Sequence, residues 1–294
     1  MKGSMKAGAV LAGGIAASAA GAVAIGRAIW RRETERAVER LDAAARAGPS
    51  PRTGRFSPDE LTALPPCAAR YFEFALAPGQ PLIRRARVAQ EGDFLLPAAG
   101  WRPFAAVEHF SVRPPGFVWD ATIGMAPLVP VHVRDSYVDG EGRTSGKAAA
   151  LVPLVDQHGG REMASASLLR HLAESPWFPT ALLPSAGVSW APRDDHTARA
   201  TLADGSVTVW ADFSFGSDGE VIGVAALRYR TVDGRQVPTP WSGRFWDYER
   251  VHGMMVPRRG EVGWVLPEGR QPYWRGRVTE LDYEPAPAEH GGRV

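Results

Sequence analysis

Short runs in which apolar and polar residues alternate dominate the chain after Leu64. Glycine, proline and aspartate separate these runs, which is typical of antiparallel strands joined by turns, because successive side chains of a strand point to opposite faces. We expect eleven strands, at residues 82–94, 104–112, 117–125, 131–138, 145–154, 197–203, 207–215, 221–231, 237–248, 254–266 and 273–283.

Four Asp-Gly pairs fall between these runs and predict hairpins. The turns that match the twist of paired strands need positive φ angles, which glycine adopts at little cost and aspartate tolerates. The pairs are Asp139-Gly140, Asp204-Gly205, Asp218-Gly219 and Asp233-Gly234.

One helix interrupts the strand pattern at residues 161–173. Ala164, Leu168 and Leu172 recur at helical spacing, and Pro176 ends the helix because proline cannot continue one. The apolar but proline-broken segment 176–184 is expected to be a fixed loop that covers the helix. The predicted fold class is mainly β (α+β), with a large curved antiparallel sheet of about eleven strands and one packed helix.

Residues 7–26 form an uninterrupted uncharged segment of the length that a helix needs to cross a bilayer. Nine alanines and five glycines make it only weakly hydrophobic. We predict a single-pass membrane anchor; a signal peptide cleaved near Ala22-Val23-Ala24 is the alternative. Gly13, Ala17 and Gly21 share one helical face, which would allow a weak homodimer through this helix.

The charges that flank this segment do not give one clear orientation of the chain in the membrane. Lys2 and Lys6 precede it, but five arginines follow it by residue 40, which places the remainder of the chain on the cytoplasmic side. A signal-anchor interpretation places it outside, and we favour this extracytoplasmic side slightly. Residues 33–47 then continue as a charged helix with a narrow apolar stripe of Val38, Leu41 and Ala45, which we expect to be a solvated stalk.

The folded domain is expected to begin just after this stalk. Ser57 can cap a short helix that has Pro58 at its first position, with Glu60 at the capping-box position. The predicted organisation is therefore an anchor and stalk over residues 1–54, a β domain over 55–284 and a disordered tail over 285–294.

Charge and cysteine content narrow the functional classes. The net charge is +2, and the 34 basic and 32 acidic residues are scattered along the chain, so we expect no nucleic-acid partner. Cys67 is the single cysteine, which excludes an intramolecular disulfide framework and a multi-cysteine zinc site.

Motifs for the common chemistries are absent from the sequence. It has no H-E-x-x-H helix, no G-x-S-x-G elbow and no G-x-x-x-x-G-K-[ST] loop. We therefore predict no metal and no cofactor, and we assign no catalytic residue.

Candidate binding residues come from aromatic and charged side chains in apolar surroundings. The chain has ten tryptophans, each of which must bury a large ring while its indole N–H finds an acceptor. Charged residues inside apolar strands need partners, and they serve either as internal ion pairs or as polar anchors for a ligand. The predicted ligand-binding residues are Trp119, Asp120, Arg134, Asp135, Tyr137, Trp177, Phe178, Trp241, Arg244 and Trp246.

Four long motifs resemble a bacterial family of membrane-anchored proteins of unknown function (DUF6544/DUF6920-like). They are R-P-P-G-F-V-W-D-A at 113–121, P-W-F-P-T-A-L-L-P-S at 176–185, P-W-S-G-R-F at 240–245 and Y-W-R-G-R at 273–277, and the resemblance runs from about residue 64 to 283. More distantly, the first of these motifs beside a single helix resembles the LolA-like lipoprotein carriers. That resemblance implies a half-barrel that cradles acyl chains under a helical lid.

Three hypotheses follow. The first is a membrane-anchored protein that binds a lipid or other apolar ligand in the concavity of the sheet. The second is an enzyme that acts on an apolar substrate through Asp120, Arg134 and Asp135. The third is a structural envelope protein with a filled core and no ligand.

Overall fold

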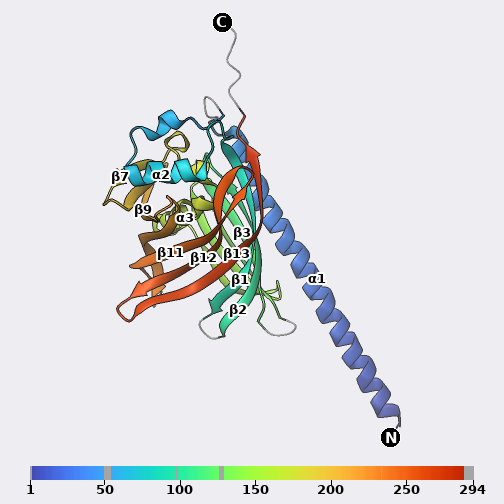
Figure 1. Ribbon diagram of the computed structural model, residues 1–294. Coiled ribbons are helices and arrows are strands. Elements are labelled where there is room, and N and C mark those ends of the chain that lie inside the picture. Colours follow the sequence, from blue (N-terminus) through green and yellow to red (C-terminus); the bar gives the residue numbers. More distant parts are fainter. Residues whose placement is uncertain (1, 50–53, 97–98, 126–128, 233, 288–294) are drawn as a thin grey trace.

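The computed structural model describes residues 2–49, 54–96, 99–125, 129–232 and 234–287, with side chains from residue 20 onward and that of Ser18. Its main element is one open antiparallel sheet, which bends around a central helix (Figure 1). The strands are β1 (Ile83–Leu96), β2 (Gly100–Ser111), β3 (Gly116–Ile123), β4 (Val131–Val138), β5 (Glu141–Ala148), β6 (Val152–His158), β7 (Ser189–Pro192), β8 (Thr197–Asp204), β9 (Val207–Phe215), β10 (Val221–Val232), β11 (Arg235–Val251), β12 (Met254–Leu266) and β13 (Gly269–Pro285).

The strand order is β6-β5-β4-β3-β2-β1-β13-β12-β11-β10-β9-β8-β7. Two runs of neighbouring strands thus meet at the junction of β1 with β13, whose residues are almost two hundred positions apart in sequence. Ion pairs cross this junction, including Arg277 to Glu91 at 2.5 Å and Arg275 to Asp93 at 3.1 Å. Opposite charges on facing strands help to fix the register of the pairing.

The predicted β architecture is confirmed, and the count of strands is corrected from eleven to thirteen. The expected strand 145–154 covers the end of β5, a turn and the start of β6, because Ala149 and Ala150 adopt positive φ angles and reverse the chain. The short strand β7 was not predicted. Helix α2 (Pro66–Ala75) was not predicted either; it buries Tyr71 and Phe72 completely.

Three of the four predicted hairpin turns join consecutive strands as expected. Asp139 and Gly140 both have positive φ angles, and Gly205 and Gly219 have them in the next two turns. Gly234 also has a positive φ angle, whereas Asp233 lies outside the described residues.

Helix α3 (Arg161–Glu174) lies on the inner, concave face of the sheet, as predicted, and it extends one residue beyond the expected end (Figure 1). It is followed by three short 3-10 helices, η2 (Ser175–Trp177), η3 (Pro179–Leu182) and η4 (Pro184–Ala186), which form the expected buried, proline-broken segment. Leu168, Leu172, Phe178 and Leu182 are completely buried. Most of the concavity is therefore filled by the protein itself.

Helix α1 (Lys2–Ala47) is continuous, and its C-terminal half lies on the outer, convex face, beside β1 to β4 (Figure 1). Leu41 packs with Val118 of β3 and Val138 of β4, and Asp42 forms an ion pair with Arg85. The expectation of a solvated stalk is wrong, because the apolar stripe that includes Leu41 covers apolar side chains of the sheet. The short helix η1 (Pro58–Leu61) begins as predicted, with the Ser57 hydroxyl accepting from the Asp59 amide at 3.3 Å.

The N-terminal half of α1 projects away from the sheet (Figure 1). Within the described part of the chain, no helix has the combination of length and hydropathy that a membrane crossing requires. Membrane attachment through residues 7–26 stays a prediction. The predicted homodimer also stays one, since the side chains of Gly13 and Ala17 lie outside the described residues.

Candidate functional site

A row of polar and aromatic side chains crosses the inner face of the sheet. Glu108 of β2 faces Trp119 of β3, which in turn faces Asp135 of β4. All three point inward because each occupies the same phase of its strand as the neighbouring core residues. Glu108 has no exposed surface at all, although it carries a carboxyl group.

Helix α3 brings a guanidinium group into this row. Arg170 lies within 3.0 Å of three carboxyl groups: Glu108 Oε1 at 2.9 Å, Asp135 Oδ2 at 3.0 Å and Glu174 Oε1 at 2.9 Å. Glu174 and Arg170 face the same way because they are one helical turn apart. The guanidinium group also lies 5.0 Å from the centre of the Trp119 ring, within the range of a cation–π contact.

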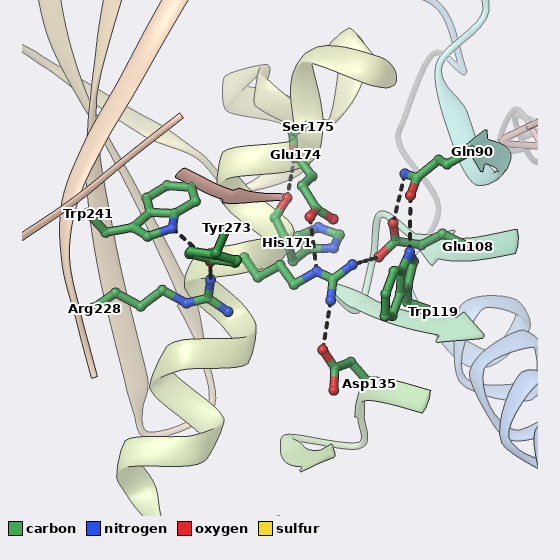
Figure 2. A network of polar contacts seen from close by, with 11 residues as sticks. Gln90, Glu108, Trp119, Asp135, His171, Glu174, Ser175, Arg228, Trp241 and Tyr273 are labelled. Carbon is green, nitrogen blue, oxygen red and sulfur yellow. Dashed lines mark hydrogen bonds and ion pairs between the residues drawn. The ribbon is translucent and has the colours of Figure 1, made fainter. Parts of the chain in front are cut away.

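A second set of hydrogen bonds holds Glu108 from the side opposite to Arg170. Gln90 of β1 donates from Nε2 to Glu108 Oε2 at 3.2 Å and accepts from Trp119 Nε1 at 3.0 Å. Figure 2 shows Gln90, Glu108 and Trp119 as one connected group, with Glu174 above and Asp135 below the point where the Arg170 contacts meet. The side-chain amide of Gln90 and the indole N–H of Trp119 therefore both have hydrogen-bond partners.

The cluster contains more carboxyl groups than one arginine can neutralise, and this changes their protonation. Burial raises the pKa of Glu108 well above its usual range; Arg170 opposes this shift, and the neighbouring Glu174 adds to it. Burial also raises the pKa of Glu174, against the effect of Arg170. Two adjacent buried carboxyl groups share a proton more readily than they hold two negative charges. Burial therefore keeps the Glu108 carboxyl group protonated to a higher pH than that of an exposed glutamate.

A pocket of about 110 Å³ lies beside this cluster, between α3 and strands β10 to β13. Tyr273 of β13 joins residues of β10 and β11 in the strand wall of the pocket, because its hydroxyl accepts from Arg228 Nη1 at 3.0 Å and from Trp241 Nε1 at 2.9 Å (Figure 2). Seven aromatic rings line the pocket: Phe94, Trp119, Trp177, Trp241, Phe245, Tyr273 and Trp274.

Glycines on β12 and β13 make room for one of these rings. Gly276 faces Gly260 across the two strands, and a Cβ atom on Gly276 would lie 2.6 Å from the indole of Trp274. Any larger residue at position 276 would therefore displace the ring. The glycine is a requirement of the pocket wall.

Four buried polar atoms at this pocket have no hydrogen-bond partner among the described residues. They are the acceptors Asp135 Oδ1 and Glu174 Oε2 and the donors Trp177 Nε1 and Arg228 Nε. Their residues all line the pocket. Because buried polar groups are almost always paired, such a concentration indicates a place that water or a ligand completes.

Five of the ten predicted site residues line this pocket: Trp119, Asp135, Trp177, Trp241 and Arg244. Three predicted residues lie elsewhere in the core or on the surface. Phe178 packs on Phe110, with ring centres 4.5 Å apart, and the Tyr137 hydroxyl donates to Asp204 at 2.8 Å. Trp246 is on the outer side of β11 and is 44% exposed.

Asp120 and Arg134 do not belong to the pocket, and their expected grouping with Asp135 is wrong. They face each other on β3 and β4, one position out of phase with Trp119 and Asp135, so they lie on the outer face under α1. Trp30 of α1 donates from Nε1 to Asp120 Oδ1 at 2.8 Å, and Arg134 pairs with Glu33 at 3.1 Å. The three residues that the enzyme hypothesis required lie on opposite sides of the sheet.

Sequence patterns did not identify Glu108, Arg170 and Glu174, which form the centre of the cluster. Glu108 could have been found, because it takes an inward position between Ala106 and Phe110 in an alternating strand. The pair Arg170 and Glu174 carries a weaker signal, because helix pairs at this spacing are usually exposed.

The space between the three carboxyl groups, where a metal ion could be bound, is filled by a guanidinium group. Arg170 occupies the space between Glu108, Asp135 and Glu174. In the described ranges, no three histidine, cysteine or acidic residues are arranged to bind a metal ion. What the arrangement offers chemically is hydrogen bonding, a buried carboxyl group of raised pKa and aromatic surface.

Comparisons with known proteins place the chain in a family. No curated protein matches it. Among solved structures it is similar to the crystal structure of a LolA superfamily protein from Nitrosomonas europaea, at 12% sequence identity and a TM-score of 0.34, over 75% of this chain and 93% of that one. A family of unknown function, DUF6920, matches residues 62–283. The chain therefore belongs to the DUF6920 family.

Proposed function

We propose that this protein binds a small neutral ligand, or the neutral end of a larger one, in the pocket between α3 and strands β10 to β13. The observation that carries the proposal is the set of four unpartnered polar atoms at a pocket with seven aromatic rings. Apolar walls with a few convergent polar groups are the usual composition of a ligand site. The rings would hold an apolar body, and the polar atoms would orient it.

The size of the pocket limits what can enter. Its volume of about 110 Å³ is below the ~300–1,000 Å³ of ordinary ligand sites and close to the ~150 Å³ of an engineered cavity that binds benzene. One ring-sized group therefore fits. A whole acyl chain would require α3 or segment 175–186 to move. If the ligand is a lipid, only one end of it therefore enters the pocket.

The charges at the pocket favour a neutral group. Three arginines (Arg170, Arg228 and Arg244) and three acids (Asp135, Glu174 and Glu261) line it, so the formal charges cancel. A carboxylate would meet the unpartnered oxygens of Asp135 and Glu174, which repel it. A primary amide suits the site better, since it donates to these oxygens and accepts from Trp177 or Arg228.

Three ring compounds that differ only in their polar group test this proposal. Benzamide is neutral, benzoate is an anion and benzylammonium is a cation. Ligand-observed NMR with the full chain should show benzamide binding most tightly, and benzoate roughly tenfold or more weaker, because it leaves charged acceptors unpaired. Equal affinities, or tighter binding of benzoate, would contradict the assignment.

A matched pair of tryptophan variants locates the binding. Trp177→Phe keeps a ring but removes the Nε1 donor, and it should weaken benzamide binding by roughly two- to tenfold. Trp246→Phe makes the same change on the outer face of the sheet and should have no effect. Equal effects of the two variants would place the ligand elsewhere.

The structural hypothesis remains the second candidate, because the complete burial of Phe178, Leu168 and Leu172 shows a largely filled concavity. It predicts that the full chain, purified without detergent, has the mass of the bare protein by native mass spectrometry. It also predicts that none of the three probes binds. A co-purifying molecule with an apolar body would support the binding hypothesis instead.

A further inference from the structure

Large apolar side chains are exposed at the corner of the sheet where α1 leaves it. Gly26 of α1 packs so closely on the turn between β5 and β6 that a Cβ atom there would lie 2.7 Å from both Ala150 and Leu151. The Ala149 amide donates to the Pro130 carbonyl at 2.8 Å, which joins the start of β4 to the same turn. We call the exposed residues here the corner patch: Ile25, Ile29, Val129, Leu151, Val152 and Leu154, which are 40–63% exposed.

Basic side chains follow the corner patch along α1. Arg27, Arg31, Arg32 and Arg36 are exposed on the next turns of α1. A groove of about 600 Å³ continues from them between α1 and strands β4 to β6. Five arginines and lysines line it against three acidic residues: Arg36, Arg40, Arg134, Arg143 and Lys147 against Glu33, Glu141 and Asp156.

We propose that the corner patch and the arginines beside it rest on the surface of an anionic lipid bilayer. Apolar side chains next to a cluster of arginines match the boundary between acyl chains and negatively charged headgroups. The patch is also continuous with residues 7–26, the uncharged part of α1 that projects past this corner (Figure 1). A soluble protein partner would match the exposed apolar residues but would not need the projecting uncharged helix.

This contact would fix the orientation of the domain. With α1 as one point of attachment and the hairpin of β5 and β6 as a second, the sheet cannot rotate freely about the helix. The proposal is independent of the ligand pocket, which lies on the inner face between α3 and strands β10 to β13.

An environment-sensitive fluorophore at position 152 tests the contact in the full chain. Cys67 is only 2% exposed, so the cysteine introduced by Val152→Cys is the accessible site of labelling. The matched control is Leu227→Cys on β10, where the native side chain is 53% exposed. Vesicles of phosphatidylcholine, with and without phosphatidylglycerol, are the probes.

We expect the label at 152 to shift its emission to shorter wavelength with vesicles that contain phosphatidylglycerol, and the label at 227 to stay unchanged. Arg27→Gln together with Arg32→Gln should reduce the shift, because these arginines attract the anionic headgroups. The proposal is overturned if the chain floats with vesicles while the label at 152 remains in water, or if the chain does not bind vesicles. A concentration-dependent shift without lipid would show instead that the patch joins two copies of the chain.

Discussion

Strands β3 and β4 carry two arginine–tryptophan sites on opposite faces, and these sites differ in how much water reaches them. On the inner face, Arg170 lies over Trp119 and meets three carboxyl groups, of which Glu108 is fully buried. On the outer face, Arg134 lies 4.5 Å from the centre of the Trp30 ring and pairs with Glu33, whose side chain is 36% exposed. Water can solvate the Glu33 carboxylate at the outer site, whereas it does not reach Glu108 at the inner site.

This difference indicates two roles for similar chemistry. The outer site attaches α1 to the sheet, because Trp30 and Glu33 come from the helix and Asp120 and Arg134 come from the strands. The inner site has unpaired acceptors and an excess of carboxyl groups, which a purely structural contact does not need. Substitutions at each site separate these two roles.

The largest effect is expected from removing the central guanidinium group. Arg170→Met would leave three carboxyl groups without their cation, and we expect a loss of about 3–5 kcal/mol in the free energy of unfolding, measured in urea. Arg134→Met is the matched outer variant, and it should cost about 1–2 kcal/mol because Glu33 can turn to water.

If Arg170→Met does not fold, the double variant with Glu108→Gln still tests the cluster. Removing the Glu108 carboxyl group together with Arg170 should recover part of the stability, since the double variant leaves two carboxyl groups without their cation instead of three. Additive losses would show that the two residues do not interact as the distances indicate.

A smaller effect concerns pH. The raised pKa of Glu108 means that the folded state holds a proton that the unfolded state has lost, at pH values above the ordinary carboxyl pKa of 4.5. Stability should therefore fall as pH rises through the raised value, by at most about 1.4 kcal/mol per pH unit. Glu108→Gln should lack this fall.

Unfolding free energies of the unmodified protein and of the Glu108→Gln variant, measured between pH 5 and 9, test the prediction. Burial lowers the pKa of His171 to about 4, so His171 destabilises the fold only as pH drops below 6.5. Its contribution is the same in both proteins and cancels in their difference. If the unfolding free energies of both proteins depend on pH in the same way, Glu108 is ionised over the whole range from pH 5 to 9.

The most local effect is expected at the outer site. Trp30→Phe removes the donor to Asp120 and should cost about 1–2 kcal/mol. Hydrogen exchange should become faster in the part of α1 near residue 30 and stay unchanged in α3. Faster exchange in both helices would contradict the separation of the two sites.

The sequence predicted the fold well where the signal was local. Alternation and Asp-Gly turns located most strands, and Pro176 located the end of α3, because these features act through residues close in the chain. Helix α2 was missed because its core residues, Tyr71 and Phe72, are compatible with a strand as well as a helix. The outward phase of Asp120 and Arg134 could be read from alternation, but their partner Trp30 lies 90 residues before Asp120, and no local pattern connects them.

The site was predictable only in part for the same reason. Aromatic content pointed to Trp119, Trp177 and Trp241, which do line the pocket. The cluster that gives the pocket its polarity depends on α3 crossing three particular strands. That crossing is a tertiary arrangement, and the spacing of residues in the sequence does not determine it.

The junction of β1 with β13 has a consequence for how the protein is made. Because β13 is translated only after β2 to β12, β1 waits with an unpaired edge while these intervening strands are made. Unpaired edges invite pairing with other chains, and contacts between distant segments form slowly. The charged residues along this edge, including Arg85, Arg87, Glu91 and Asp93, would make the nascent chain a poor template for aggregation until the final strand arrives.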